Sequence, residues 1–129
     1  MEIMPIESIP AFHSVPHSDI HIRSSPNTII ILVDSEKEER ICLRFSPYQA
    51  IRVTTDDCFS MRQYGTFPFA RLCIIHNSLW KAELKRVLQS VDHNATFLDD
   101  AKHFILFTTE GAIEIVASEI VYEVIAARN

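Results

Sequence analysis

Asn77-Ser78-Leu79-Trp80-Lys81-Ala82-Glu83-Leu84 opens the stretch that decides the fold, which continues through His103-Phe104-Ile105-Leu106-Phe107 and Ile113-Glu114-Ile115-Val116-Ala117. Asn77 and Ser78 are both suitable N-cap residues, because their side chains can accept hydrogen bonds from the first free amides of a helix. Apolar residues then recur at helical spacing. The two later runs are strand-like and flank a Gly turn. This stretch predicts one helix over residues 78–92, followed by an antiparallel hairpin.

Period-two alternation and β-branched runs predict further strands upstream of the helix. Asp19–Arg23 alternates, and Thr28–Asp34 is an unbroken apolar run typical of a strand buried on both faces. Ile41–Ser46 alternates again, and the apolar residues beyond Pro47 keep the same parity. Both one bent strand across a bulge and a separate strand at 48–55 are consistent with this pattern.

Two other segments complete the predicted sheet. Phe69–His76 has strand character immediately before the helix, and Glu119–Ile125 alternates after the hairpin. A C-terminal helix capped by Ser118 is the alternative for the last segment. Residues 1–18 hold three of the six prolines and predict an irregular N-terminal arm, with or without a short edge strand.

These elements predict an α+β fold. We expect a mainly antiparallel, strongly twisted or partly rolled sheet of about six to eight strands, packed on one principal helix at residues 78–92. Residues 19–129 form a single domain in this interpretation. The predicted core consists of Ile31, Val33, Leu43, Phe45, Trp80, Leu84, Leu88, Phe104, Leu106 and Ile115.

Composition excludes several classes of function. The chain has 129 residues, a net charge of −5 and scattered Lys and Arg, so we expect no nucleic-acid partner. Its two glycines cannot form a P-loop or a dinucleotide-binding motif. The start lacks the pattern of a signal peptide, and no apolar run reaches membrane-spanning length, which predicts a soluble cytoplasmic protein without membrane association. Three widely spaced cysteines predict reduced thiols.

The polar and aromatic residues have no recognisable catalytic pattern. We predict no catalytic residue, metal or cofactor, and Pro16 interrupts the only regular histidine series, at residues 13, 17 and 21. Glu114 is interpreted as an outward sheet charge that could pair with an arginine, and Trp80 as the main core anchor of the helix. His103 is expected at a core boundary, hydrogen-bonded to a turn or to the helix cap.

Asn77, Ser78 and Trp80, followed by His103-Phe104 and Glu114–Ala117, resemble the corresponding residues of a group of small bacterial proteins. Some members of this group are similar to toxin-neutralising immunity proteins. The resemblance covers roughly the C-terminal half of the chain and, more loosely, Phe45–Phe59. It implies a non-catalytic acidic module that blocks a partner by surface complementarity, and it carries over no catalytic residue.

Our leading hypothesis is therefore a non-enzymatic protein-interaction module, immunity-like in type, with an unknown protein partner. The alternative is a small-ligand-binding or enzymatic domain with a pocket between sheet and helix. The residues predicted to line that pocket are Arg52, Cys58, Tyr64, Trp80 and His103. A homodimer is a third hypothesis, because Asp19–Arg23 and Glu119–Ile125 are candidate edge strands.

Overall fold

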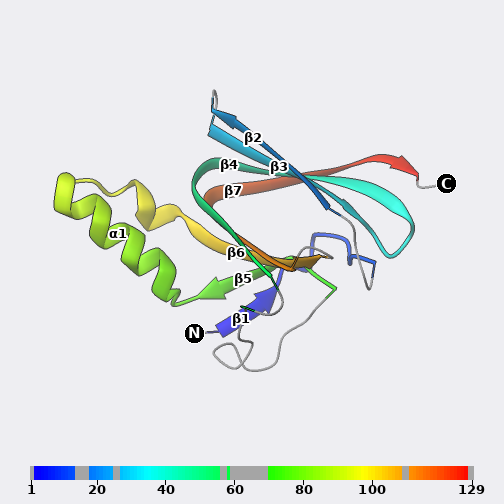
Figure 1. Cartoon of the computed structure of the whole chain (residues 1–129), viewed down its shortest axis with the longest axis horizontal. Coiled ribbons are helices and arrows are strands. Elements are labelled where there is room, and N and C mark those ends of the chain that lie inside the picture. The colour runs from blue at the N-terminus through cyan, green and yellow to red at the C-terminus, as the bar shows by residue number, and fades with distance from the viewer. Residues whose placement is uncertain are drawn as a thin grey trace.

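The computed structural model describes residues 2–13, 18–24, 27–55, 58, 70–108 and 111–127, and it contains one seven-stranded sheet in the order β1-β5-β6-β7-β4-β3-β2. Every neighbouring pair of strands is antiparallel. Figure 1 shows the long strands β4 and β7 running side by side through the middle of the sheet. The strands are β1 (Glu2–Pro5), β2 (Ser18–Ser24), β3 (Asn27–Asp34), β4 (Glu39–Thr54), β5 (Cys73–His76), β6 (Lys102–Thr108) and β7 (Gly111–Ala127).

One α-helix, α1 (Leu79–Val91), and a short 3-10 helix, η3 (Phe97–Asp100), connect β5 to β6. The predicted α+β class and the predicted number of strands are confirmed. β3 is buried on both faces, as its unbroken apolar run predicted. The segments on either side of Pro47 form one strand, β4, with a register shift between Tyr48 and Ala50.

β7 corrects the prediction for the end of the chain. The two predicted strands, Ala112–Ala117 and Glu119–Ile125, are parts of one continuous strand, and a C-terminal helix is ruled out because β4 pairs with β7 as far as Ala127. Of the predicted strand Phe69–His76, Cys73–His76 forms β5, residues 70–72 do not belong to it, and Phe69 lies outside the described residues.

The main core lies on one face of the sheet and unites residues from both halves of it. Phe45 of β4 and Phe104 of β6 meet edge to face with ring centroids 5.2 Å apart. Seven of the ten predicted core residues are fully buried in this cluster, which confirms that part of the prediction. They are Ile31, Val33, Leu43, Phe45, Phe104, Leu106 and Ile115.

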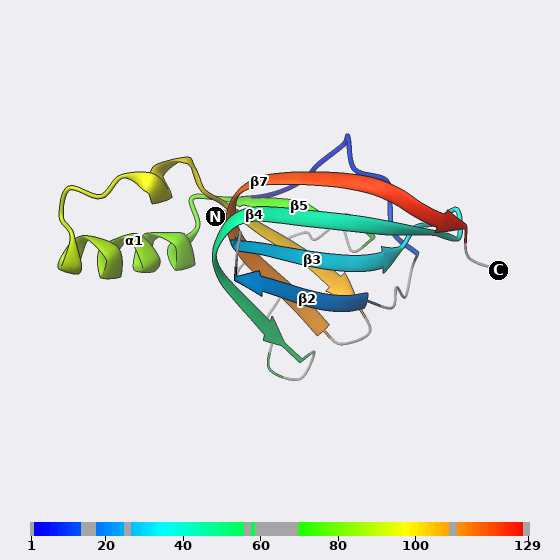
Figure 2. The ribbon, with the colours of Figure 1, turned by 90° about the horizontal axis from the view of Figure 1, so that it is seen from above.

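The other three predicted core residues, Trp80, Leu84 and Leu88, lie elsewhere. They are partly buried and pack in a separate small cluster with Leu98, Ala101 and Val116. The prediction that they belong to the main core is wrong, because α1 extends away from the sheet (Figure 2) and its apolar side packs on the η3 segment and on residues of the central strands β4 and β7. The exposed fractions of Val87 and Val91 are accordingly 66% and 86%.

The N-terminal arm is tied to the sheet. β1 is an edge strand that pairs with β5, and Ile9 and Phe12 are buried in the main core. The backbone N–H of Phe12 donates to the carbonyl of Ala70 at 2.7 Å, and the N–H of Glu36 donates to the carbonyl of Ala11 at 3.0 Å. These contacts fix the arm against the β3–β4 turn.

Candidate functional site

A series of hydrogen bonds runs from β4 through β7 and β6 to the first turn of α1. Arg52 donates from Nε and Nη2 to the two carboxylate oxygens of Glu114, at 2.7 and 3.0 Å. His103 places Nε2 at 2.8 Å from Glu114 Oε1 and Nδ1 at 2.6 Å from Ser78 Oγ. Ser78 Oγ also accepts from the backbone N–H of Lys81 at 3.0 Å. We refer to Arg52, Glu114, His103 and Ser78 together as the polar network.

The strand register explains why these side chains meet. Arg52 in β4 lies directly opposite Glu114 in β7, and His103 in β6 lies directly opposite Val116, two residues further along β7. Residues two apart share a face of a strand, so His103 and Glu114 project from the same side of the sheet. Asn77 adopts a left-handed conformation with φ 56°, which Asn tolerates better than most residues, and turns the chain from β5 into the helix cap at Ser78.

The bonding partners of His103 indicate where the protons of the network lie when its imidazole is neutral. A carboxylate only accepts hydrogen bonds, so Nε2 of His103 carries the proton that is donated to Glu114. In a neutral imidazole, Nδ1 is then an acceptor, and the hydroxyl of Ser78 donates to it. Within the described ranges, no buried side-chain nitrogen or oxygen lacks a partner. The prediction that His103 binds the helix cap is confirmed.

Glu114 is the carboxylic acid of the network, and its surroundings shift its pKa strongly. Its exposed fraction is 1%, so the prediction of an outward sheet charge is wrong, although the expected pairing with an arginine is present. Burial alone would raise its pKa, but hydrogen bonds from His103 and Arg52 and the charge of Arg52 outweigh this effect. Together they lower the pKa of Glu114 from an ordinary 4.5 to about 2. The side chain is therefore ionised at neutral pH.

Trp80 covers the network from the helix side. Its indole lies 4.2 Å from the guanidinium carbon of Arg52, measured to the ring centroid, and it meets the His103 ring edge to face at 5.2 Å. A guanidinium over an aromatic face is attracted by the negative charge of that face. Trp80 thus holds α1 against the polar network, and its interpretation as the main core anchor is corrected.

The structure brings together three of the five residues that were predicted to line a pocket. Trp80 contacts both Arg52 and His103, as described above. Cys58 is exposed, and its backbone N–H donates to the carbonyl of Thr55; Tyr64 lies outside the described residues. Sequence reasoning missed Ser78 and Glu114 as members of the site. Ser78 had been considered only as a helix cap, and nothing in its local pattern signalled a histidine from a distant strand.

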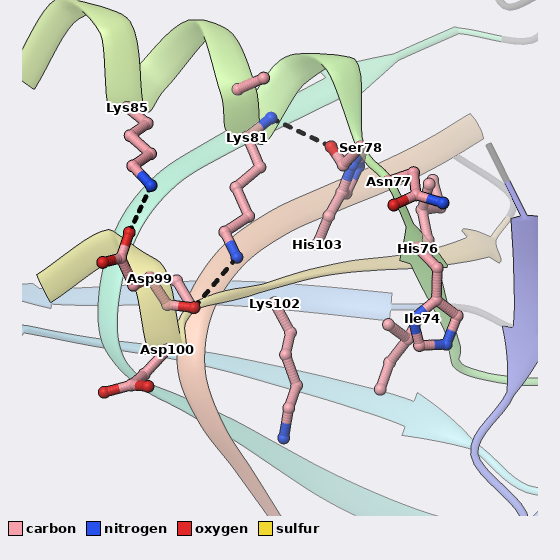
Figure 3. Close-up of a pocket in the computed structure, with 13 residues that line it drawn as sticks. Ile74, His76, Asn77, Ser78, Lys81, Lys85, Asp99, Asp100, Lys102 and His103 are labelled. Carbon is pink, nitrogen blue, oxygen red and sulfur yellow. Dashed lines mark hydrogen bonds and ion pairs between the residues drawn. The ribbon is translucent and has the colours of Figure 1, made fainter. Parts of the chain in front are cut away.

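A pocket of about 770 Å³ opens beside the network, between the end of β5, the first turns of α1 and the η3 segment. His103 and Ser78 contribute to its wall, whereas Arg52 and Trp80 do not line it. Figure 3 shows Lys81 and Lys85 reaching across it towards η3. Lys85 Nζ lies 2.6 Å from a carboxylate oxygen of Asp99, and Lys81 Nζ donates to the Asp99 carbonyl at 3.3 Å.

A second surface lies at the C-terminal half of β7. β6 pairs with β7 only as far as Ala117, while β4 continues to pair along its other side. Among the described residues, no strand lies beside residues 118–127 on the side away from β4. This half of β7 carries exposed apolar side chains on both faces, with exposed fractions of 41–58%. They are Val121, Tyr122, Val124 and Ile125. We call residues 118–127 the open β7 edge.

The open β7 edge differs in chemistry from the outer strand β2. β2 presents the exposed polar residues Asp19 and His21, and charged or polar residues protect sheet edges from unwanted pairing. The open β7 edge has one exposed ion pair, in which Arg44 lies 3.1 Å from Glu123, and otherwise a mainly apolar surface. Of the two edges predicted from sequence, β7 is therefore better suited to pairing.

Comparisons with known proteins found no similarity that assigns a function. No family model matches the chain, and neither a search of curated proteins nor one of solved structures found a match. The resemblance to immunity-like proteins stays a prediction. No helix within the described ranges is long and apolar enough to cross a membrane. No three His, Cys, Asp or Glu side chains gather there as metal ligands would, and His17 of the histidine series lies outside those ranges.

Proposed function

We propose that this chain is a non-enzymatic protein-interaction module that binds a partner strand along the open β7 edge. The observation that carries the proposal is the combination of four exposed apolar side chains with a strand side that no other strand of the described residues pairs with. Such an edge offers backbone N–H and C=O groups to an added strand, and alternate side chains on its two faces provide specificity. Blocking a toxin, as an immunity-like protein does, is one use of this kind of surface.

The fold supports the proposal because the edge is held rigidly. Tyr122 and Val124 pair with Leu43 and Ile41 of β4, both fully buried in the main core. A partner strand would therefore meet a prearranged backbone, which reduces the conformational entropy lost on binding.

A site-specific photo-crosslinker tests this proposal. p-Benzoylphenylalanine in place of Tyr122 should yield covalent adducts with another polypeptide in cells of the native host, identified by mass spectrometry. The control carries the same group at Val87, an apolar residue on α1 that is even more exposed than Tyr122. Adducts at position 122 that are missing at position 87 support the proposal. The absence of any protein adduct at position 122, or equal labelling at both positions, refutes it.

A nucleophilic enzyme is the second candidate function, and the hydrogen bonds of Ser78 favour it. Ser78, His103 and Glu114 follow the order hydroxyl, imidazole and carboxylate that activates a serine nucleophile, and Ser78 borders the pocket. A fluorophosphonate probe would react with such a serine. Mass spectrometry that maps the adduct to Ser78 supports this candidate, whereas an unmodified Ser78 under conditions that label a standard serine hydrolase rejects it.

A further inference from the structure

We infer that a second copy of this chain is the strand that pairs with the open β7 edge, antiparallel and with Tyr122 opposite Tyr122 of its partner. This inference rests on the proposed function and specifies the partner. Two identical strands can pair about a twofold axis, so that each residue facing another is faced by it in return. Only some registers satisfy the charges and the geometry of β7.

The first condition is that directly opposite residues share a face of the sheet. Along residues 119–124 the faces alternate: Ile120, Tyr122 and Val124 lie opposite the buried residues Phe45, Leu43 and Ile41 of β4. The twofold axis must therefore pass through a residue, because only then do facing residues have the same parity. The possible centres are the individual positions of the open β7 edge.

Charge excludes two of the central positions. A centre at Glu123 would place two carboxylates directly opposite each other, and a centre at Val121 would place Glu119 opposite Glu123 twice. Like charges in directly opposite positions destabilise antiparallel pairs. A centre at Tyr122 avoids both arrangements, since Glu119 then faces Ile125 and Glu123 faces Val121.

Strand geometry disfavours the next centres on either side. A centre at Ile120 would bring Ala117 into the new ladder, although β6 already pairs with Ala117 through Lys102. The register between β4 and β7 shifts next to Val124, because Ile41 pairs with Val124 whereas the preceding residue, Arg40, pairs with Ala126. A centre at Val124 would place this irregularity directly beside the axis. A centre at Tyr122 keeps this irregularity away from the axis and lets residues 119–125 of the two copies face one another, along the part of β7 that, among the described residues, has only β4 as a neighbouring strand.

The resulting dimer would continue the main core face across the axis. Tyr122 would meet its own copy, and Ile120 would face Val124 on either side, directly in front of buried β4 residues. On the opposite face, Val121 would cover the hydrocarbon part of Glu123, whose carboxylate stays paired with Arg44. The pairing would thus cover the exposed apolar residues of the open β7 edge, with Glu123 still paired with Arg44 and Glu119 at either end of the new ladder.

Introducing a charge at the axis tests this register. Tyr122→Lys and Tyr122→Glu should each abolish the dimer seen for the wild type, with at least a tenfold rise in the dimer dissociation constant by sedimentation equilibrium. An equimolar mixture of the two variants should restore a dimer, because Lys then faces Glu. Val87→Lys on α1 is the control and should dimerise like the wild type. Circular dichroism confirms that each variant is folded.

Cysteine cross-linking provides the second measurement. In a Cys58→Ser background, Tyr122→Cys should form an intermolecular disulfide under mild oxidation, because the two copies face each other. Val124→Cys is the matched control, since residue 124 faces residue 120 and lies about 13 Å from its own copy, too far for a disulfide.

Three results would overturn the inference: a monomeric wild type at every concentration tested, a dimer that persists in both charge variants, or equal disulfide formation at positions 122 and 124. A monomeric chain whose Tyr122 crosslinker still captures a different protein would leave the proposed function standing. An unlabelled position 122 in a dimeric protein would refute both.

Discussion

Replacing Glu114 with Gln should remove a defined part of the stability of the fold. Glutamine keeps the size of the side chain but loses the charge that faces Arg52 and His103. Glu114 is almost completely buried, so water cannot replace the lost interactions. The expected result is a folded variant with a lower free energy of unfolding at neutral pH.

The magnitude follows from the pKa of Glu114. The folded state lowers this pKa from 4.5 to about 2, and at about 1.4 kcal/mol for each tenfold change in proton affinity the ionised carboxylate contributes about 3 kcal/mol. Between pH 4.5 and about 2 the unfolded chain binds more protons than the folded one, so stability falls as the pH falls. The contribution is complete above pH 4.5, and about 2 kcal/mol of it is lost at pH 3.

Urea denaturation at several pH values measures this contribution. At pH 7 the variant should be about 2–4 kcal/mol less stable than the wild type, and the difference should shrink by about 2 kcal/mol at pH 3. Glu83→Gln, at an exposed position of α1 outside the proposed interface, serves as the control and should change stability by less than about 0.5 kcal/mol. A Glu114→Gln difference below about 1 kcal/mol at pH 7, or one that stays constant down to pH 3, would refute the reasoning.

Three further predictions concern other parts of the fold. Ser78→Ala removes the helix cap and the hydroxyl that bonds His103, so the free energy of unfolding, measured by thermal denaturation, should fall by about 1–3 kcal/mol. An unchanged melting temperature would contradict these two hydrogen bonds. Gly111→Ala should lower the free energy of unfolding, measured by urea denaturation, by more than about 2 kcal/mol. Gly111 has φ +120°, and an added Cβ would lie 2.2 Å from the carbonyl oxygen of Thr54. Burial raises the pKa of Cys73 to about 11, so a thiol reagent at pH 8 should modify exposed Cys58 quickly and Cys73 only after unfolding; equal rates would contradict the burial.

The strands and the main core could be predicted because their signals are local. The β-branched run that became β3 and the alternation in β4 each select one conformation and one inward face, and the core residues of these strands are buried as expected. The helix cap at Ser78 was likewise predictable from residue type and position. These features depend on neighbours in sequence, which the chain itself displays.

The site could be predicted only in part, because it depends on which faces are covered. The alternating pattern of β7 places Glu114 on the face opposite to Ile113 and Ile115, and this pattern predicts an exposed Glu114. Both faces of β7 are buried along residues 111–117, since Trp80, His103 and the α1 segment cover the second face there. Period two separates the faces of a strand but does not indicate whether the second face is open.

β7 contributes to both the polar network and the proposed interface, but with different halves of the strand. Its first half, residues 111–117, has β6 and β4 as neighbours and carries Glu114. In its second half, β4 is the one neighbouring strand that the described part of the chain provides. Substitutions in the polar network should therefore change stability and leave association intact as long as the chain is folded. Tyr122→Lys, at a side chain that is already 41% exposed, should do the reverse. If Glu114→Gln weakened the dimer more than it destabilised the monomer, the network would be part of the interface and this separation would be wrong.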